Sequence, residues 1–222
     1  MGYNIAIDGP AGAGKSTIAK LAAKELSFIY VDTGAMYRTI ALALLRAKID
    51  IADVHAVEAL LSEISVSIRY IDGEQRVFLG TEDVSALIRT EEVGNMASKA
   101  AALEPVRAKL LSLQRGLAEE NDVVMDGRDI GTNILPNAEL KIYLTASVDT
   151  RADRRYKEHL AKGETCDLEE IKRDIEQRDF QDMNRAIAPL CQAEDAVYLD
   201  SSDMTIEQVV KAITERARRA EA

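Results

Sequence analysis

The sequence contains few of the residues that form disulfide scaffolds and metal centres. Its 222 residues include no tryptophan, two cysteines and two histidines. The cysteines, Cys166 and Cys191, lie far apart and belong to no CxxC pair, which argues against a disulfide framework and against a cysteine-based metal site. His55 and His159 are too few for a histidine-based metal centre. We therefore expect a chain that folds on its hydrophobic core alone, in a reducing compartment.

Long hydrophobic runs and an excess of positive charge are also missing. No window approaches the roughly 18 apolar residues of a membrane-spanning helix, and the first residues lack the basic and apolar regions of a signal peptide. We expect a cytoplasmic protein. The chain has 38 acidic and 28 basic residues, a net charge of −10. This charge repels polyanions, so nucleic acid and anionic membranes are disfavoured as partners, and a small anionic substrate would need a locally basic site.

What the sequence does contain is an alternation of strand-like and helical segments. Strands are expected at residues 3–7, 28–31, 123–125, 140–144 and 196–199; helices are expected at 15–26, 36–45, 53–64, from about 90, and at 105–119, 149–161, 168–182 and 205–218. Strands separated by helices predict an α/β fold with a parallel sheet covered by helices on both faces. Residues 66–70 and 76–79 alternate apolar and polar side chains around Asp72-Gly73, which predicts a β-hairpin inserted into this order.

The first expected strand leads into Gly9-Pro10-Ala11-Gly12-Ala13-Gly14-Lys15-Ser16, followed by Thr17. This segment matches the phosphate-binding pattern G-x-x-x-x-G-K-[ST]. Glycines let backbone N–H groups face a phosphate chain, and the helix that follows adds its positive N-terminal end. In this pattern Lys15 reaches the β- and γ-phosphates, and the Ser16 hydroxyl binds Mg²⁺. The alternative, a glycine-rich turn with an unrelated lysine, fits the strand before the motif and the helix after it less well.

Two further segments follow expected strands, where ligands bind in open α/β sheets. The first, Asp32-Thr33-Gly34-Ala35-Met36-Tyr37-Arg38, brings Arg38 to the start of a helix; the alternative role for Thr33 is that of a helix N-cap. The second is Asp126-Gly127-Arg128-Asp129-Ile130-Gly131-Thr132. Asp126 ends a buried strand and could hold an Mg²⁺-bound water. Arg128 suits a phosphate, and Asp129 suits an exocyclic amine such as that of cytosine. The alternative for this segment is a surface turn with a local Asp–Arg pair.

Arginines gather in the two charged helices near the C-terminal third. Arg178, Asp182 and Arg185 are spaced to share one helix face, and the alternative is a salt-bridge ladder on a solvated face. A second group lies in the preceding expected helix: Arg151, Arg154 and Arg155. Phosphoryl transfer needs such a cationic clamp and the exclusion of water. The GTPase patterns DxxG and NKxD are absent from the sequence, which favours a small-molecule kinase over a GTPase.

Together these motifs resemble the bacterial-type cytidylate kinases, which belong to the nucleoside monophosphate kinases with a P-loop fold. The resemblance extends over essentially the whole chain, through residues 5–17, 32–38, 93–98, 105–107, 114–115, 126–132, 178–182, 185 and 188–190. It implies a P-loop core (1–32, 111–147 and 186–222), a monophosphate-binding domain (33–110, with a small inserted antiparallel sheet at about 64–89) and a helical lid (148–185). Family members often carry Ser at the position of Thr33, whose additional methyl group would narrow the base site.

The resemblance also implies roles for individual residues. ATP phosphates are held by Gly9, Pro10, Ala11, Gly12, Ala13, Gly14, Lys15, Ser16 and Thr17. The cytosine is surrounded by Thr33, Ser98, Arg107 and Asp129, and the CMP phosphate is held by Arg38 and Arg128. Gly127 also contacts CMP. The ribose is contacted by Arg178 and Asp182, with Arg185 near the phosphates. The expected catalytic groups are Lys15, Arg128, Arg151, Arg154, Arg178 and Arg185, and the expected metal ligands are Ser16 and, through water, Asp126.

The activity implied is Mg²⁺-dependent in-line phosphoryl transfer from ATP to CMP and dCMP, as part of pyrimidine nucleotide metabolism. The alternatives are a small P-loop kinase that acts on UMP or AMP, and a nucleotide-binding switch without turnover. The expected partners are small nucleotides, with no nucleic acid and no membrane, and the expected state is a monomer, because closure of two mobile parts needs no subunit interface.

Overall fold

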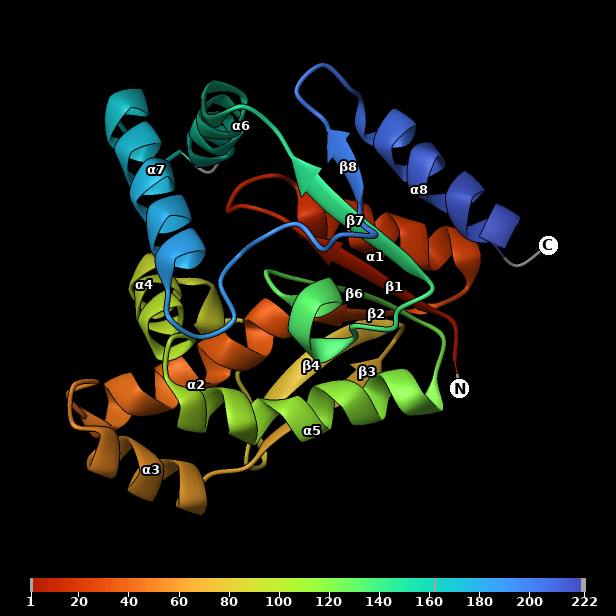
Figure 1. The fold of residues 1–222 in the computed structure, drawn as a ribbon. Coiled ribbons are helices and arrows are strands. Elements are labelled where there is room, and N and C mark those ends of the chain that lie inside the picture. The colour runs from red at the N-terminus through yellow and green to blue at the C-terminus, as the bar shows by residue number, and fades with distance from the viewer. Residues whose placement is uncertain (1, 162, 221–222) are drawn as a thin grey trace. The chain divides into compact units, whose positions relative to one another are not determined.

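The computed structural model describes residues 2–161 and 163–220, in two compact units (Figure 1). One unit is Val31–Glu120, and the other combines Gly2–Tyr30 with the chain from Asn121 onward. The predicted lid, 148–185, falls within the second unit, apart from residue 162, which lies outside the described residues. The division into core, monophosphate-binding domain and lid stays a prediction.

A five-stranded sheet positions the glycine-rich loop and the segment that begins at Asp126. Its strands are β1 (Asn4–Asp8), β2 (Ile29–Asp32), β6 (Val123–Gly127), β7 (Leu140–Thr145) and β8 (Val197–Asp200), in the order β2-β6-β1-β7-β8. β1 runs parallel to β6 and β7, and β7 runs parallel to β8. Asp8 pairs with Gly127 at the carboxyl ends of β1 and β6. The register therefore places the glycine-rich loop beside the segment that begins at Asp126, and the predicted parallel sheet is confirmed.

Helices of the second unit bury their apolar faces in two places. α1 (Lys15–Leu26) and α8 (Ile206–Ala220) pack on the sheet in a core that includes Ile5, Ile18, Val124, Val209 and Ile213. α6 (Val148–Ala161) and α7 (Leu168–Asn184) pack on each other through Ala152, Ile171 and Ile175. Figure 1 shows the first pair lying together along the sheet and the second as a separate hairpin of helices. A short π-helical turn, Ile130–Ile134, follows β6 and was not expected from the sequence.

The first unit surrounds helix α2 (Thr33–Ala47). It also contains α3 (Val54–Glu63), α4 (Glu91–Ala100), α5 (Glu104–Glu120), a 3-10 turn, Leu87–Arg89, and an antiparallel sheet of β3 (Val66–Ile71), β4 (Glu74–Leu79) and β5 (Glu82–Asp83). α2 packs against α4, α5 and β4. The predicted hairpin is confirmed, with Asp72 and Gly73 both at positive φ as a two-residue turn requires. Within the described chain, no helix has the length and apolar character needed to span a bilayer.

Candidate nucleotide-binding site

The phosphate-binding loop takes a conformation that only glycine allows at its first position. Gly9 has a φ of +149°, and a Cβ atom there would lie 1.9 Å from the carbonyl oxygen of Leu144 in β7. Gly14 adopts the left-handed conformation at the N-terminus of α1, where its carbonyl accepts the first hydrogen bond of the helix from Ile18. The loop therefore turns sharply out of β1 and directs the N-terminal end of α1 toward its interior, as an anion-binding loop requires.

Lys15 lies buried inside this loop. Its Nζ donates to the carbonyl oxygen of Pro10 at 2.7 Å, so the side chain curls over the loop's backbone. Burial, together with the nearby Arg128 guanidinium, lowers the pKa of Lys15 well below its usual value, although Asp126, Asp182 and Asp8 oppose this. A phosphate placed here would stabilise the charged ammonium that burial disfavours. The electrostatics thus favour an anionic ligand beside Lys15.

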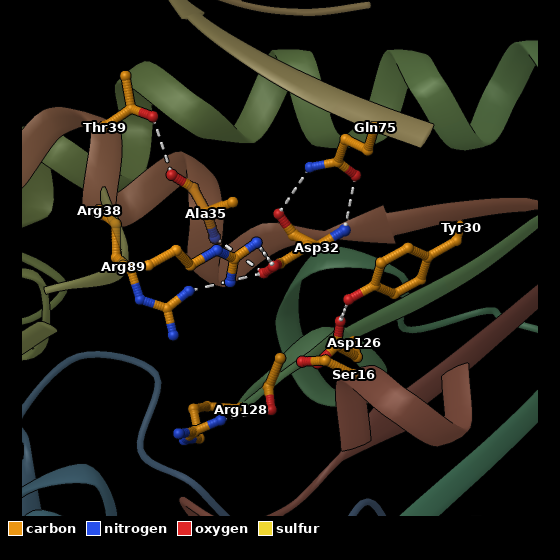
Figure 2. Close-up of polar contacts among 11 residues, drawn as sticks. Ser16, Tyr30, Asp32, Ala35, Arg38, Thr39, Gln75, Arg89, Asp126 and Arg128 are labelled. Atoms are coloured by element: carbon orange, nitrogen blue, oxygen red, sulfur yellow. Dashed lines mark hydrogen bonds and ion pairs between the residues drawn. The ribbon is translucent and has the colours of Figure 1, made fainter. Parts of the chain in front are cut away.

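Asp126 brings two hydroxyl groups together at the end of β6. Ser16 Oγ donates to Asp126 Oδ2, and Tyr30 Oη donates to Asp126 Oδ1, both at 2.9 Å (Figure 2). A serine hydroxyl beside a carboxylate offers the hard oxygen ligands that Mg²⁺ prefers, and this ion typically uses one or two carboxylates with waters and substrate phosphates. The described residues contain no group of three or more metal-ligating acidic, histidine or cysteine side chains. Ser16 and Asp126 therefore fit the predicted metal role.

The backbone of Ala11 is held on both sides by residues of α6 and α7. Its N–H donates to Asp179 Oδ1 at 3.3 Å, and its carbonyl oxygen accepts from Arg151 Nη1 at 2.9 Å. Arg151 and Asp179 form a buried ion pair of 2.6 Å, and Arg151 Nε also donates to the carbonyl oxygen of Ala146. Arg154 lies elsewhere and donates to the carbonyl oxygen of Ser201 at 2.8 Å. In this structure Arg151 braces the glycine-rich loop, whereas Arg154 contacts the chain after β8.

Asp129 is buried just beyond β6. Its Oδ1 accepts from Arg185 Nη2 at 3.0 Å, and its Oδ2 accepts from Asn133 Nδ2 at 3.2 Å. The next two backbone N–H groups, of Ile130 and Gly131, donate to the Asp8 carboxylate at 2.8 and 2.7 Å. Asp8 immediately precedes the glycine-rich loop, so one buried carboxylate joins that loop to the segment that carries Asp129.

Asp8 titrates abnormally because of this position. Burial raises its pKa to about 6, even though the two backbone N–H groups lower it; Asp129 adds to the rise and Lys15 opposes it. The ordinary value in the unfolded chain is 3.8. Near neutral pH the ionised carboxylate of Asp8 therefore lowers the stability of the folded protein. Such perturbed pKa values are typical of functional sites.

Arg128 and Asp182 form the second ion pair of this site. Arg128 Nε donates to Asp182 Oδ2 at 2.8 Å. Burial alone would raise the pKa of Asp182, but Arg128, Arg185 and Arg178 lower it below its usual range. Because the carboxylate and guanidinium come from α7 and the end of β6, the pair is neither local nor exposed. The alternative of a surface turn with a local Asp–Arg pair is wrong.

One geometric expectation for α7 is also wrong. The helix ends at Asn184, and Arg185 has extended backbone angles, so Arg185 does not share a helix face with Arg178 and Asp182. Its Nε donates to the carbonyl oxygen of Ala188 at 2.6 Å while its Nη2 reaches Asp129. These contacts hold Arg185 in the extended segment that follows the helix.

In the first unit, Asp32 organises the start of α2. Its Oδ1 accepts from the N–H of Ala35 at 2.8 Å, so Asp32 is the helix N-cap. Thr33 is the first helical residue and is buried, so the alternative that Thr33 is the cap is wrong. Arg89 Nη2 lies 3.0 Å from Asp32 Oδ2, and Arg38 Nη1 lies 4.0 Å from Oδ1 (Figure 2). Two guanidinium groups therefore meet at one buried carboxylate beside Thr33.

The other predicted base-site residues of this unit come from α4 and α5. Arg107 is buried in α5, where Nη1 donates to the carbonyl oxygen of Ala101 at 3.3 Å and the guanidinium lies 5.8 Å from the centre of the Tyr37 ring. Ser98 is half-buried in α4. The predicted acceptor residues thus divide between the units, with Thr33, Arg38, Ser98 and Arg107 in Val31–Glu120 and the rest in the other unit.

Sequence reasoning missed several polar residues of these networks: Asp8, Tyr30, Gln75, Arg89 and Asp179. Asp8 and Asp179 stood directly beside quoted motifs, and a buried acid at the end of a strand was a usable signal. Tyr30 lies two residues before Asp32 in the same strand, where a half-buried tyrosine usually finds a hydrogen-bond partner. For Gln75 and Arg89 the sequence offered no signal, because their partner is more than 40 residues away.

The fold and this site define a class of protein. A parallel sheet whose first strand enters a glycine-rich loop, with a buried lysine and a Ser–Asp pair beside it, is a P-loop kinase architecture. The chain belongs to the cytidylate kinase family, because the family model described as "Cytidylate kinase" matches residues 5–219. The resemblance found in the sequence is confirmed.

Individual relatives agree with the family. The cytidylate kinase of Streptococcus pneumoniae (strain 70585) is 51% identical over 216 residues, which cover 97% of each chain. The cytidylate kinase of strain Hungary19A-6 matches with the same identity and coverage. Among solved structures, an uncharacterized protein from Eubacterium ventriosum ATCC 27560 is 12% identical, with a TM-score of 0.53 over 97% of this chain and 98% of that chain. That likeness concerns the fold alone.

Proposed function

We propose that this protein transfers the γ-phosphoryl group of ATP to CMP and dCMP, giving ADP and CDP or dCDP. The observation that carries the proposal is the buried Asp129, which Asp8 ties to the glycine-rich loop of the same unit. A carboxylate accepts a hydrogen bond from the exocyclic amine of cytosine and repels the carbonyl oxygen that uracil has there. Membership of the cytidylate kinase family supports the same substrate.

On the donor side, residues Gly9 to Thr17 surround the ATP phosphates. The backbone N–H groups of the loop and the buried Lys15 neutralise the phosphate charge. Ser16, and Asp126 through a water, would hold Mg²⁺, and the ion would supply further charge neutralisation to the phosphates. Asp179 and Arg151 keep the loop in shape through Ala11.

On the acceptor side, each predicted residue takes the role that its chemistry fits. Thr33, Ser98, Arg107 and Asp129 surround the cytosine, and Arg38 and Arg128 hold the CMP phosphate. Gly127 contacts CMP, and Arg178 and Asp182 contact the ribose hydroxyls. Arg185 lies near the phosphates and orients Asp129. A guanidinium carries five N–H donors, so Arg128 and Arg185 can bind phosphate oxygens and keep their carboxylate partners.

The reaction requires no general base. The attacking atom is a phosphate oxygen that is already anionic, so catalysis consists of positioning and charge neutralisation by Lys15 and the arginines. Water competes for the γ-phosphoryl group, which is the reason to expect closure of the monophosphate-binding domain and the lid over bound substrates. Arg151 and Arg154 serve as clamps only if closure moves them from their present partners, Ala11 and Ser201.

Further predictions concern the setting of the enzyme. Its partners are small nucleotides, without nucleic acid or a membrane, and it acts as a monomer in the cytoplasm, where ATP and CMP are available together. Sedimentation of the pure protein over a range of concentrations tests the monomer.

The experiment that tests the function is ADP release from ATP and Mg²⁺, measured with and without CMP, with the product identified by anion-exchange chromatography. We expect release that depends on CMP and equals the CDP formed. Binding of ATP without turnover would contradict the proposal and favour a nucleotide-binding switch. Release of ADP without an acceptor would contradict it in another way, because water would then be the acceptor.

A further inference from the structure

The inserted sheet of the first unit makes a specific contact outside itself. Gln75, on β4, places its side-chain amide against the backbone of Asp32 at the end of β2 (Figure 2). Its Oε1 accepts from the Asp32 N–H at 2.8 Å, and its Nε2 donates to the Asp32 carbonyl oxygen at 3.2 Å. One amide thus satisfies both backbone groups of a single residue, which is what a neighbouring strand would otherwise do.

Asp32 links the Gln75 contact to helix α2. Its carboxylate caps α2 through Ala35 and pairs with Arg89, which also lies in the inserted segment. With Gln75 on its backbone and Arg89 on its side chain, Asp32 is fixed from both directions by the insert. The residue is buried, so water cannot easily replace these hydrogen bonds when one is removed.

The geometry of α2 depends on this residue. Thr33 follows Asp32 directly and opens the helix, and Arg38 lies in the second turn. Because the N-cap sets where and in which direction a helix begins, a shift of Asp32 would move both side chains together.

Packing alone gives no reason for the residue type at position 75. Gln75 is half-buried, and its cross-strand neighbour in the sheet is Tyr70. An apolar side chain of similar length would fill the same volume, whereas only an amide both donates and accepts in one plane.

We propose that Gln75 is a positioning residue for the acceptor nucleotide: it fixes the Asp32 backbone and thereby aims Thr33 at the base and Arg38 at the phosphate. The inference rests on the proposed function, in which Thr33 and Arg38 contact CMP. It gives the inserted sheet a task, which is to set acceptor affinity without touching the acceptor itself.

The test compares Gln75→Met with the unchanged protein and with Arg76→Ala. Methionine keeps the length of the side chain and loses both hydrogen bonds; Arg76 is the next residue on β4, and its nearest charged partner is Glu74 at 3.7 Å. We expect Gln75→Met to raise the Kd for CMP, measured by calorimetry, and the KM for CMP by about 5- to 30-fold, which corresponds to one to two lost neutral hydrogen bonds. In Gln75→Met the KM for ATP should stay close to that of the unchanged protein, and the melting temperature should fall, because two buried backbone groups lose their partners. In Arg76→Ala the melting temperature, the affinity for CMP and both KM values should stay close to those of the unchanged protein.

Amide hydrogen exchange supplies a second readout that does not depend on activity. The Asp32 N–H should exchange faster in Gln75→Met than in the unchanged protein or in Arg76→Ala. Unchanged CMP affinity in Gln75→Met, or an equal loss for ATP and CMP, would overturn the inference. Failure of the proposed function would look different, because Arg38→Ala would then leave CMP binding unaltered whatever Gln75→Met does.

Discussion

At the scale of single residues, the proposed substrate choice depends on Asp129. The carboxylate is buried, and Arg185 and Asn133 fix its two oxygens. A carboxylate in such a place is acceptor-only, so it can bind the amine of cytosine and cannot bind the O4 of uracil. The ion pair with Arg185 holds the carboxylate in one orientation, as the proposed reading of the base requires.

We predict that Asp129→Asn lowers kcat/KM for CMP by about 10- to 150-fold, the value of a hydrogen bond to a charged group. The KM for ATP should change little. Asparagine also carries an NH₂ donor, so the preference for CMP over UMP should narrow. Steady-state kinetics with CMP, UMP and ATP measure this. Asn133→Ala is the comparison variant: it keeps the Asp129 carboxylate and removes one of its hydrogen bonds, so its loss for CMP should be smaller. Equal losses for CMP and ATP would show that Asp129 acts on the fold and not on the base.

At the scale of elements, the glycine-rich loop is held by the helices that follow β7. Ala11 is bonded through its N–H to Asp179 of α7 and through its carbonyl to Arg151 of α6. The two side chains also form a buried ion pair. A buried pair is stable only while both charges are present, so the loop, α6 and α7 depend on one another.

A double-mutant cycle tests this dependence. Asp179→Asn leaves Arg151 buried without a charged partner and should cost about 3 kcal/mol of unfolding free energy. Arg151→Met combined with Asp179→Asn removes the uncompensated charge, so the double variant should be more stable than the sum of the single changes predicts. Urea titrations measure the stabilities, and the KM for ATP should rise in every variant. Additive effects would mean that the pair contributes nothing as a pair.

An added side chain should have different effects at Gly9 and at Gly14 of the loop. Gly9→Ala would place a Cβ atom 1.9 Å from the Leu144 carbonyl oxygen, so β1 and β7 would have to separate. At Gly14 a Cβ atom meets no atom within 4 Å, and the cost is only that of a positive φ, about 1 to 2 kcal/mol. We expect Gly9→Ala to lower the melting temperature much more than Gly14→Ala, as calorimetry would show. A similar shift in both would contradict the close approach of β7.

At the scale of the whole molecule, the sequence predicted the fold because its elements are long and strongly patterned. The parallel strands, the hairpin at Asp72-Gly73 and α1 were found where expected. The short β5, the 3-10 turn, Leu87–Arg89, and the π-helical turn after Asp129 were not, since segments of two to five residues carry no periodicity.

The site was predictable where chemistry follows one motif and not where it depends on distant partners. The glycine-rich loop, Asp126 and Asp129 could be identified as candidates because their residue types stand at the ends of expected strands. The contacts of Arg185 with Asp129 and of Gln75 with Asp32 span 56 and 43 residues, and tertiary packing alone decides them. The same packing ended α7 at Asn184, which local spacing did not indicate.

Asp8 predicts how the stability of the molecule depends on pH. Its pKa is about 6 in the folded protein and 3.8 in the unfolded chain, so the folded state binds more protons between these values. The contribution of Asp8 to the unfolding free energy therefore falls as pH rises from about 4 to about 6, by about 3 kcal/mol, and is constant above that.

The prediction is tested by the difference in unfolding free energy between Asp8→Asn and the unchanged protein. The stability of Asp8→Asn relative to the unchanged protein should increase from about pH 4 to about pH 6 and stay constant above that, as urea titrations at several pH values would show. Asp195→Asn is the control of opposite sign, because the hydrogen bond from Lys141 lowers the pKa of Asp195, so its loss matters less as the solution becomes acidic. A pH-independent difference for Asp8→Asn would mean that Asp8 titrates normally.

The most direct test of the central claim is a comparison of acceptors. ADP production from ATP and Mg²⁺ would be measured with CMP, dCMP, UMP and AMP at equal concentrations. We predict that CMP and dCMP are clearly preferred, and that their ratio reports the proposed contact of Arg178 and Asp182 with the 2′-hydroxyl. A preference for UMP or AMP would contradict the assignment of Asp129 as the reader of cytosine while leaving the P-loop kinase fold in place.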